Sequence, residues 1–150
     1  MADDRELEIW KNLREAQDKH AYFILAAAGS ALAFAVHITI GRSLAWSMLP
    51  LGVAAACWAF SFWAGGRLIA YLNSTVYANI ALLQVKRGTH PDLRYRGNPE
   101  EIAIASAGIT AAVESNSRMV ERWGNWQTQL LVAGALAFIF WHVLEMALKR

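Results

Sequence analysis

The sequence predicts an all-α integral membrane protein with three long helices, each combining a transmembrane half with a cytoplasmic half. Three observations predict this class. Hydrophobic residues make up 56% of the 150 residues and charged residues only 17%, whereas about a quarter of the residues in a soluble domain are charged. Arg42 is the only charged residue between His20 and Gly66, and residues 123–144 contain none. Three apolar stretches reach the roughly 20 residues that a transmembrane helix needs.

Composition also argues against several other classes of protein. Such a hydrophobic chain is neither intrinsically disordered nor a disulfide scaffold, since its single cysteine, Cys57, has no partner within the chain. Lys and Arg number 14 against 12 Asp and Glu, for a net charge of +2, so no nucleic-acid partner is expected. The length fits one domain, and we treat residues 1–150 as a single helical membrane domain.

Residues 1–20 are predicted to form a cytoplasmic amphipathic helix. Acidic and basic residues are mixed along this segment, unlike the short basic start of a signal peptide. Nothing breaks the helix before Ala21, so it is expected to continue into the first span, which is retained. One face of the helix carries Ile9, Leu13, Ala16 and His20.

The three predicted transmembrane segments are residues 21–40, 44–64 and 127–148. Lys and Arg are concentrated in residues 1–20 and 65–122, whereas the hairpin between the first two spans carries only Arg42. Because basic segments remain in the cytoplasm, the predicted orientation is N-in and C-out. We expect the bilayer to be a bacterial inner (plasma) membrane.

Residues 65–122 are predicted to form a cytoplasmic helical hairpin with its loop at 88–98. Lys86, Arg87 and Gly88 form a typical helix C-terminus, with cations and a glycine at the end. Asn98 is a good N-cap for the returning helix, and Pro99 suits its first position. The predicted helices therefore cover residues 3–40, 44–87 and 99–148, each about twice as long as the bilayer core is thick.

The hairpin lacks the charges of a helix that faces water. Residues 68–85 contain no charged side chain, and apolar residues share one sector of that helix. Small residues crowd the first span, where they allow helices to approach closely. We expect these faces to pack against a second copy or against other membrane subunits. The predicted packing residues are Leu68, Leu72, Val76, Ile80, Leu83, Ile102, Ile109 and Val113, with Gly29 and Ala33 in the first span.

Two further features of the second span have a structural interpretation. Trp58, Phe60, Phe62 and Trp63 spread around the helix and are expected to face lipid. The pair at residues 65–66 is either a hinge or a place of close packing against the first helix.

His37, His142 and Glu145 form the best candidate polar site, near the outer rim of the spans. Ionisable residues at membrane depth are often functional, and this set resembles a metal site or a proton relay. We favour the simpler interpretation that these side chains extend to the headgroups and that Glu145 pairs with Arg42. No metal, cofactor or enzymatic activity is expected, since the chain has no Walker, GxGxxG, HExxH, CxxC or GxSxG motif.

The sequence is therefore typical of a non-catalytic membrane protein that self-assembles or acts as a scaffold or accessory subunit. Alternatives are a homo-oligomeric channel or membrane-perturbing effector, and a metal- or proton-handling protein. Over about residues 4–88, a helix leading into a two-span hairpin and a further helix resembles the SLATT-type effectors of bacterial conflict systems. The resemblance rests on architecture and implies the channel alternative, and the third span departs from it.

Overall fold

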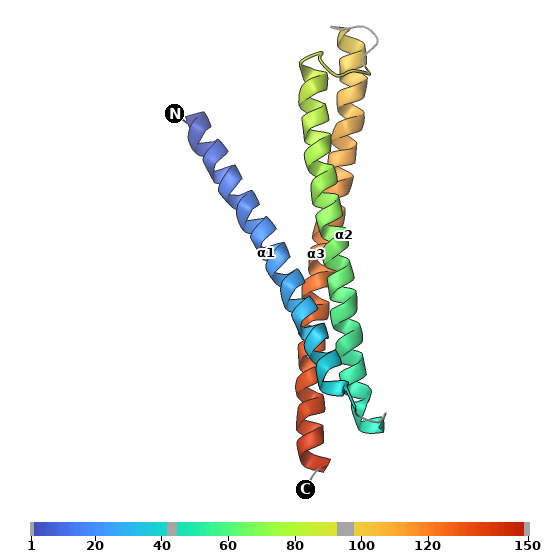
Figure 1. The fold of residues 1–150 in the computed structure, drawn as a ribbon. Helices are drawn as coiled ribbons and strands as arrows, with labels where there is room; N and C mark the ends of the chain where they lie inside the picture. Colours follow the sequence, from blue (N-terminus) through green and yellow to red (C-terminus); the bar gives the residue numbers. More distant parts are fainter. Residues whose placement is uncertain (1, 42–44, 93–97, 149–150) are drawn as a thin grey trace. The chain divides into compact units, whose positions relative to one another are not determined.

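A computed structural model describes residues 2–41, 45–92 and 98–148 and shows three long helices (Figure 1). They are α1 (Ala2–Thr39), α2 (Leu49–Lys86) and α3 (Pro99–Leu148), with a short 3₁₀-helix, η1 (Trp46–Met48), before α2. The predicted all-α class and its three long helices are confirmed. By length and composition, all three are apolar enough to cross a membrane.

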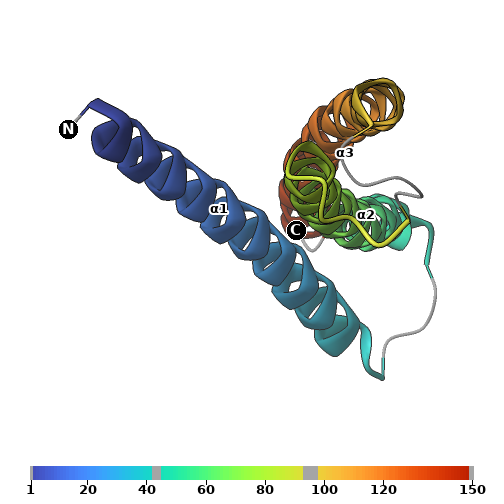
Figure 2. The same cartoon turned by 90° about the horizontal axis from the view of Figure 1, so that it is seen from above.

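The chain divides into two compact units. The three-helix unit comprises residues 1–66 and 124–150, and the hairpin unit comprises residues 67–123. In the three-helix unit, α1 crosses the paired helices α2 and α3 at an angle (Figures 1 and 2). In the hairpin unit, α2 and α3 run antiparallel to each other.

The helix termini of the hairpin unit follow the sequence prediction. Gly88 adopts a positive φ of 66°, which a glycine tolerates without a steric penalty. Its N–H donates to the Val85 carbonyl, and the Thr89 N–H donates to the Gln84 carbonyl, which is the Schellman arrangement. At the other side of the loop, the Glu100 N–H donates to Asn98 Oδ1 at 3.1 Å. The predicted C-terminal stop and N-cap are confirmed.

The second long helix begins later than its predicted start at Leu44, a residue outside the described part of the chain. Pro50 has no N–H to donate to the carbonyl of Trp46, four residues earlier, so regular α-helical bonding cannot extend back through this turn. The backbone instead forms η1, in which the Met48 N–H donates to the Ala45 carbonyl. Residues 46–48 are therefore 3₁₀, and α2 starts at Leu49.

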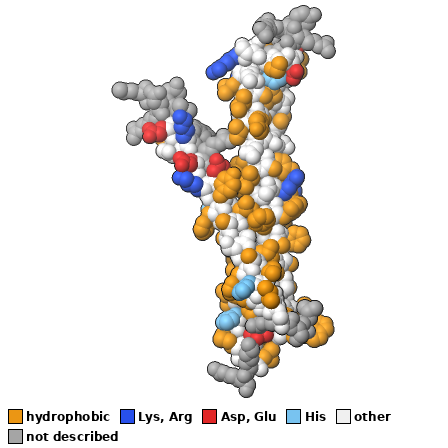
Figure 3. Space-filling model, in the orientation of Figure 1, with side chains coloured by type: hydrophobic (Ala, Val, Ile, Leu, Met, Phe, Trp, Pro, Cys, Tyr) orange, Lys and Arg blue, Asp and Glu red, His pale blue; other side chains and the backbone are white. Residues whose placement is uncertain are grey.

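Buried positions in the three-helix unit recur at a spacing of three, four or seven residues. This spacing is the pattern of helices that pack with left-handed crossings. The apolar members are Ala21, Ile24, Ala28 and Ala35 of α1, Leu51, Ala54, Trp58 and Ala64 of α2, and Trp141 of α3. The outer surface is also hydrophobic over much of the face drawn in Figure 3.

The part of α1 before Ala21 contributes little to this packing. Its described side chains from Glu8 to His20 are exposed, except that of Asp18, which is half-buried. Lys19 Nζ lies 2.8 Å from Glu15 Oε1, four residues earlier on the same helix, and both side chains are largely exposed. Such pairs add only a few tenths of a kcal/mol to a helix. The described residues of this segment are thus helical with largely unburied side chains, and the first candidate span begins within the segment, at Glu15.

Candidate functional site

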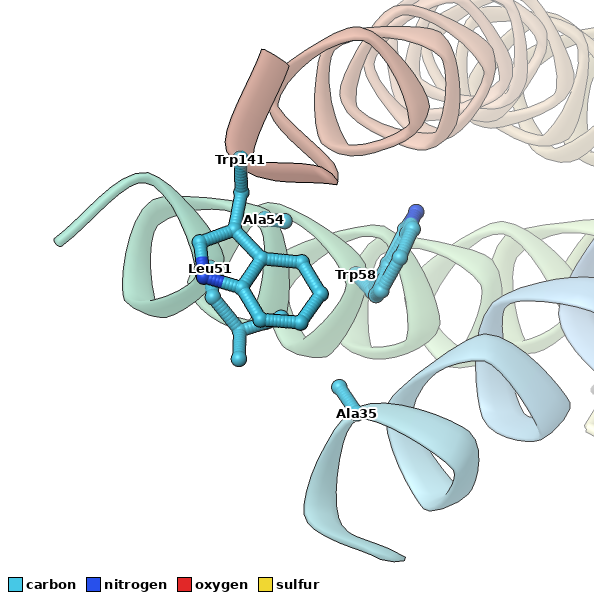
Figure 4. Packing of buried hydrophobic residues seen from close by; sticks show 5 residues of the cluster. All are labelled: Ala35, Leu51, Ala54, Trp58 and Trp141. Atoms are coloured by element: carbon cyan, nitrogen blue, oxygen red, sulfur yellow. The ribbon is translucent and has the colours of Figure 1, made fainter. Parts of the chain in front are cut away.

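An aromatic cluster joins the three helices of the three-helix unit. The ring of Phe138 on α3 lies 5.9 Å from that of Phe34 on α1, 5.7 Å from Trp58 on α2 and 5.5 Å from Trp141, measured between centroids. Figure 4 shows Trp58 extending between the helices, with Ala35 of α1 beside it. Tilted aromatic pairs at these distances add stabilisation beyond the area they bury.

Trp58 is the side chain around which α2 and α3 pack. It is only 5% exposed, so the expectation that it faces lipid is wrong, whereas Phe60, Phe62 and Trp63 are exposed as expected. The Trp58 Nε1–H donates to the carbonyl of Leu131 at 3.3 Å. A glycine makes room for the indole, because a Cβ on Gly134 would lie 2.5 Å from Trp58 Nε1.

A second contact between these helices has the same form, with the large side chain on α3 and the glycine on α2. Gln127 of α3 is 1% exposed, and its side chain lies against Gly65 of α2, where any Cβ would collide with it. The same Cβ would lie 2.7 Å from Leu25 of α1. Of the two interpretations of the glycine pair, close packing is therefore what the structure shows at Gly65. Gly66 is exposed, and a Cβ there would meet nothing within 4 Å.

Hydrogen bonds from α2 to the backbone of α3 fix the register of the two helices. Ser61 Oγ donates to the Gln127 carbonyl at 2.7 Å, one helical turn away from the Leu131 carbonyl that Trp58 uses. Both accepting oxygens belong to the backbone, and the Ser61 bond is buried while the Trp58 bond is half-buried. Gln127 Nε2 is buried with no hydrogen-bond partner in the described structure, so this amide relies on packing alone.

Of the two small residues of α1 predicted to pack, Gly29 lies against a neighbouring helix and Ala33 does not. A Cβ on Gly29 would meet the Phe62 ring of α2 at 3.4 Å, so Gly29 does contact a neighbouring helix. Ala33, in contrast, is exposed. The α1 face that contacts the other helices passes through Ala28 and Ala35, which are almost fully buried.

The predicted polar residues at the outer rim lie near the ends of two helices. His37 of α1 and His142 of α3 are exposed, and Glu145 is half-buried. The His142 ring lies 6.4 Å from the Trp141 ring, and Arg42 lies outside the described residues. Within the described ranges, no three His, Cys, Asp or Glu side chains come together in a way that could hold a metal ion.

The predicted packing residues of the hairpin unit divide into two sets. Leu68 is buried, and Leu72, Val76, Ile102, Ile109 and Val113 are half-buried. Ile80 and Leu83 remain 47% and 54% exposed, and the neighbouring Tyr77 is 74% exposed. In the described part of the hairpin, only Leu68 and Val85 are buried, so pairing of the two helices leaves much of their apolar surface uncovered.

Hydroxyl groups of the hairpin bond back to their own helices. Thr75 Oγ1 donates to the Tyr71 carbonyl, Ser106 to Ala103, Thr110 to Ser106, and Ser117 to Val113, at 2.8–3.0 Å. A hydroxyl that already donates to a backbone carbonyl has no hydrogen left to donate to other groups. The surface of the hairpin is therefore less polar than its serine and threonine content suggests.

Comparison with protein-family models, with curated proteins and with solved structures gives no match to this chain.

The fit of Trp58 against Gly134 gives a first prediction. Replacing Gly134 with alanine forces the rigid, buried indole to move, and we expect a loss of about 1–3 kcal/mol in stability, typical of overpacking. Reversible unfolding in mixed micelles, followed by circular dichroism, measures this loss. The control is G52A, because Gly52 of α2 is exposed and a Cβ there meets nothing within 4 Å. Equal stability of the two variants would contradict the proposed fit.

The interhelical hydrogen bond of Ser61 gives a second prediction. We expect S61A to lose about 0.6 kcal/mol, in the range measured for such bonds in membrane proteins. The same unfolding assay applies, with S30A as control, since Ser30 of α1 is exposed. A larger loss in S30A than in S61A would argue against the assigned role.

Proposed function

We propose that this chain is a non-catalytic membrane protein that assembles with copies of itself through the uncovered face of its hairpin unit. The exposed apolar surface at Tyr77, Ile80 and Leu83 carries this proposal. Under it, the three helices span a bacterial inner membrane with the start of α1 and the hairpin unit in the cytoplasm. The end of α3 then lies outside.

Membrane placement leaves the hairpin unit in water. At about 1.5 Å per residue, α2 is long enough to cross the roughly 30 Å bilayer core and extend well beyond it. Lys and Arg around the hairpin favour the cytoplasm for that extension. Pairing of the two helices buries only Leu68 and Val85 among the described residues of the unit, and helical stability in proteins comes mostly from the packing of an apolar face. Large exposed apolar side chains in such a position mark an interaction surface.

A second copy is the occupant that best suits this surface. Residues 68–85 and 102–113 contain no charged side chain, so the surface offers no electrostatic complement to a charged partner. An identical uncharged surface meets it without burying an unpaired charge, and two-fold symmetry is the commonest way in which identical chains associate. Ile104 of α3, which is 69% exposed, adds apolar area on the other helix of the hairpin.

The channel and metal alternatives have less support. The exposed side chains of α2 within the three-helix unit are apolar, including Val53, Phe60 and Trp63, and its buried Ser61 is used in helix packing. A water-filled pore needs a polar lining. The outer-rim histidines remain a hypothesis for metal binding, and metal analysis of the purified protein tests it.

The proposed orientation predicts which residues a membrane-impermeant thiol reagent reaches. In a C57S background, we expect A147C at the end of α3 to be labelled in intact spheroplasts of a bacterial host. D92C, at the tip of the hairpin, should be labelled only after lysis. Both positions are exposed in the structure. The reverse labelling pattern would overturn the N-in, C-out orientation.

Self-assembly predicts a specific effect of charge on the hairpin. We expect the wild-type chain in mild detergent to have a native mass that is a multiple of the chain mass. I80E would bury a charge in the contact and weaken association by at least about tenfold. The matched control is S74E, exposed on the same helix about 120° away. A monomeric wild-type mass, or equal effects of the two variants, would refute assembly through this face.

A further inference from the structure

Arg67 marks the point where the apolar part of α2 ends. Residues 43–66 carry no charge. Their helical part, η1 together with residues 49–66 of α2, is about 33 Å long, slightly more than the bilayer core. On α3, Arg122 is the last charged residue before the uncharged run 123–144. The Trp123 ring lies within 6.0 Å of the Arg67 guanidinium, so the two antiparallel helices end their apolar runs at the same level.

The guanidinium of Arg67 is held in place by aromatic neighbours. Its Nη2 donates to the Tyr71 hydroxyl at 3.2 Å. Its central carbon lies 5.3 Å from the centre of the Tyr71 ring and 6.0 Å from that of the Trp123 ring. Contacts of this kind are cation–π interactions, which favour a fixed position of an otherwise flexible side chain.

The charge of Arg67 is not neutralised within the described protein. No carboxylate of the described residues lies within 4.0 Å of the guanidinium. The Arg67 side chain is also exposed. Tyr71 uses one part of the guanidinium, and the remaining N–H donors are available to a ligand. A planar guanidinium with free donors matches the oxygens of a phosphate group.

We propose that Arg67, positioned by Tyr71 and Trp123, binds the phosphate of an anionic phospholipid in the cytoplasmic leaflet. The depth of the site favours a lipid as the source of the phosphate, because Arg67 directly follows a run that spans the hydrocarbon core. An arginine that only extended to the headgroups would need no such aromatic support. The inference rests on the membrane placement in the proposed function, and self-assembly is not needed for it.

Native mass spectrometry of the purified full chain in mild detergent tests this site. Dioleoyl phosphatidylglycerol is titrated against the wild-type chain, R67Q and Y71F, with dioleoyl phosphatidylcholine as the zwitterionic comparison. We expect R67Q to bind phosphatidylglycerol about fivefold more weakly, as is typical for one basic residue at an anionic surface. Y71F keeps the ring and the charge but loses the hydroxyl, and about a twofold weakening is expected.

R87Q is the matched control, since it removes the same charge from an exposed position directly after α2, which ends at Lys86. Its affinity should stay within about twofold of wild type, because Arg87 lies more than a Debye length from Arg67. Wild-type affinity in R67Q or Y71F, or an equal loss in R87Q, overturns the proposal. Displacement of the lipid by millimolar inorganic phosphate overturns the assignment to a lipid. The I80E variant distinguishes lipid binding from self-assembly, because the I80E protein should be monomeric and should still bind the lipid.

Discussion

Close approach of α2 and α3 is the constraint on which the rest of the three-helix unit depends. Each helix supplies one glycine at the contact, and each glycine receives a large side chain of the other helix: Trp58 lies against Gly134, and Gln127 lies against Gly65. Without a hydrophobic driving force between helices in lipid, such close packing and interhelical hydrogen bonds supply much of the association energy. The aromatic cluster around Phe138 then adds α1 to this pair.

The hairpin unit differs from the three-helix unit in that its helix ends are well capped but little of its apolar surface is buried. Its helix ends are fully specified, by the left-handed Gly88 at the end of α2 and the Asn98 cap at the start of α3. Few of its apolar side chains are buried. Leu68 and Val85, near the two ends of the α2 part of the unit, are buried, whereas Ile80 and Leu83 are exposed. These exposed apolar side chains are the observation on which the proposed self-assembly rests.

The sequence was sufficient to predict the helical class, the three apolar segments and the ends of the hairpin loop, since these depend on local composition and on capping residues. It did not predict the role of Trp58, because the pattern of an apolar span does not distinguish the face that meets lipid from the face that meets a helix. Lipid and a protein interior are similarly apolar. The α-helix of the second span starts at Leu49, after its predicted start at Leu44, because Pro50 has no N–H to bond the carbonyl of the preceding turn. The glycines were the available signal for the contact: Gly65 and Gly134 stand on two different spans, and small residues mark helix contacts in membranes.

The bonds from Trp58 and Ser61 end on main-chain oxygens of α3, at Leu131 and Gln127. Every amino acid provides that oxygen, so a substitution of Leu131 that keeps its packing against the core does not remove the acceptor. Comparison of paired substitutions would therefore reveal little coupling between positions 58 and 131. The evolutionary trace of the contact should instead be a restriction on size at position 134, where any side chain would occupy the space of the indole.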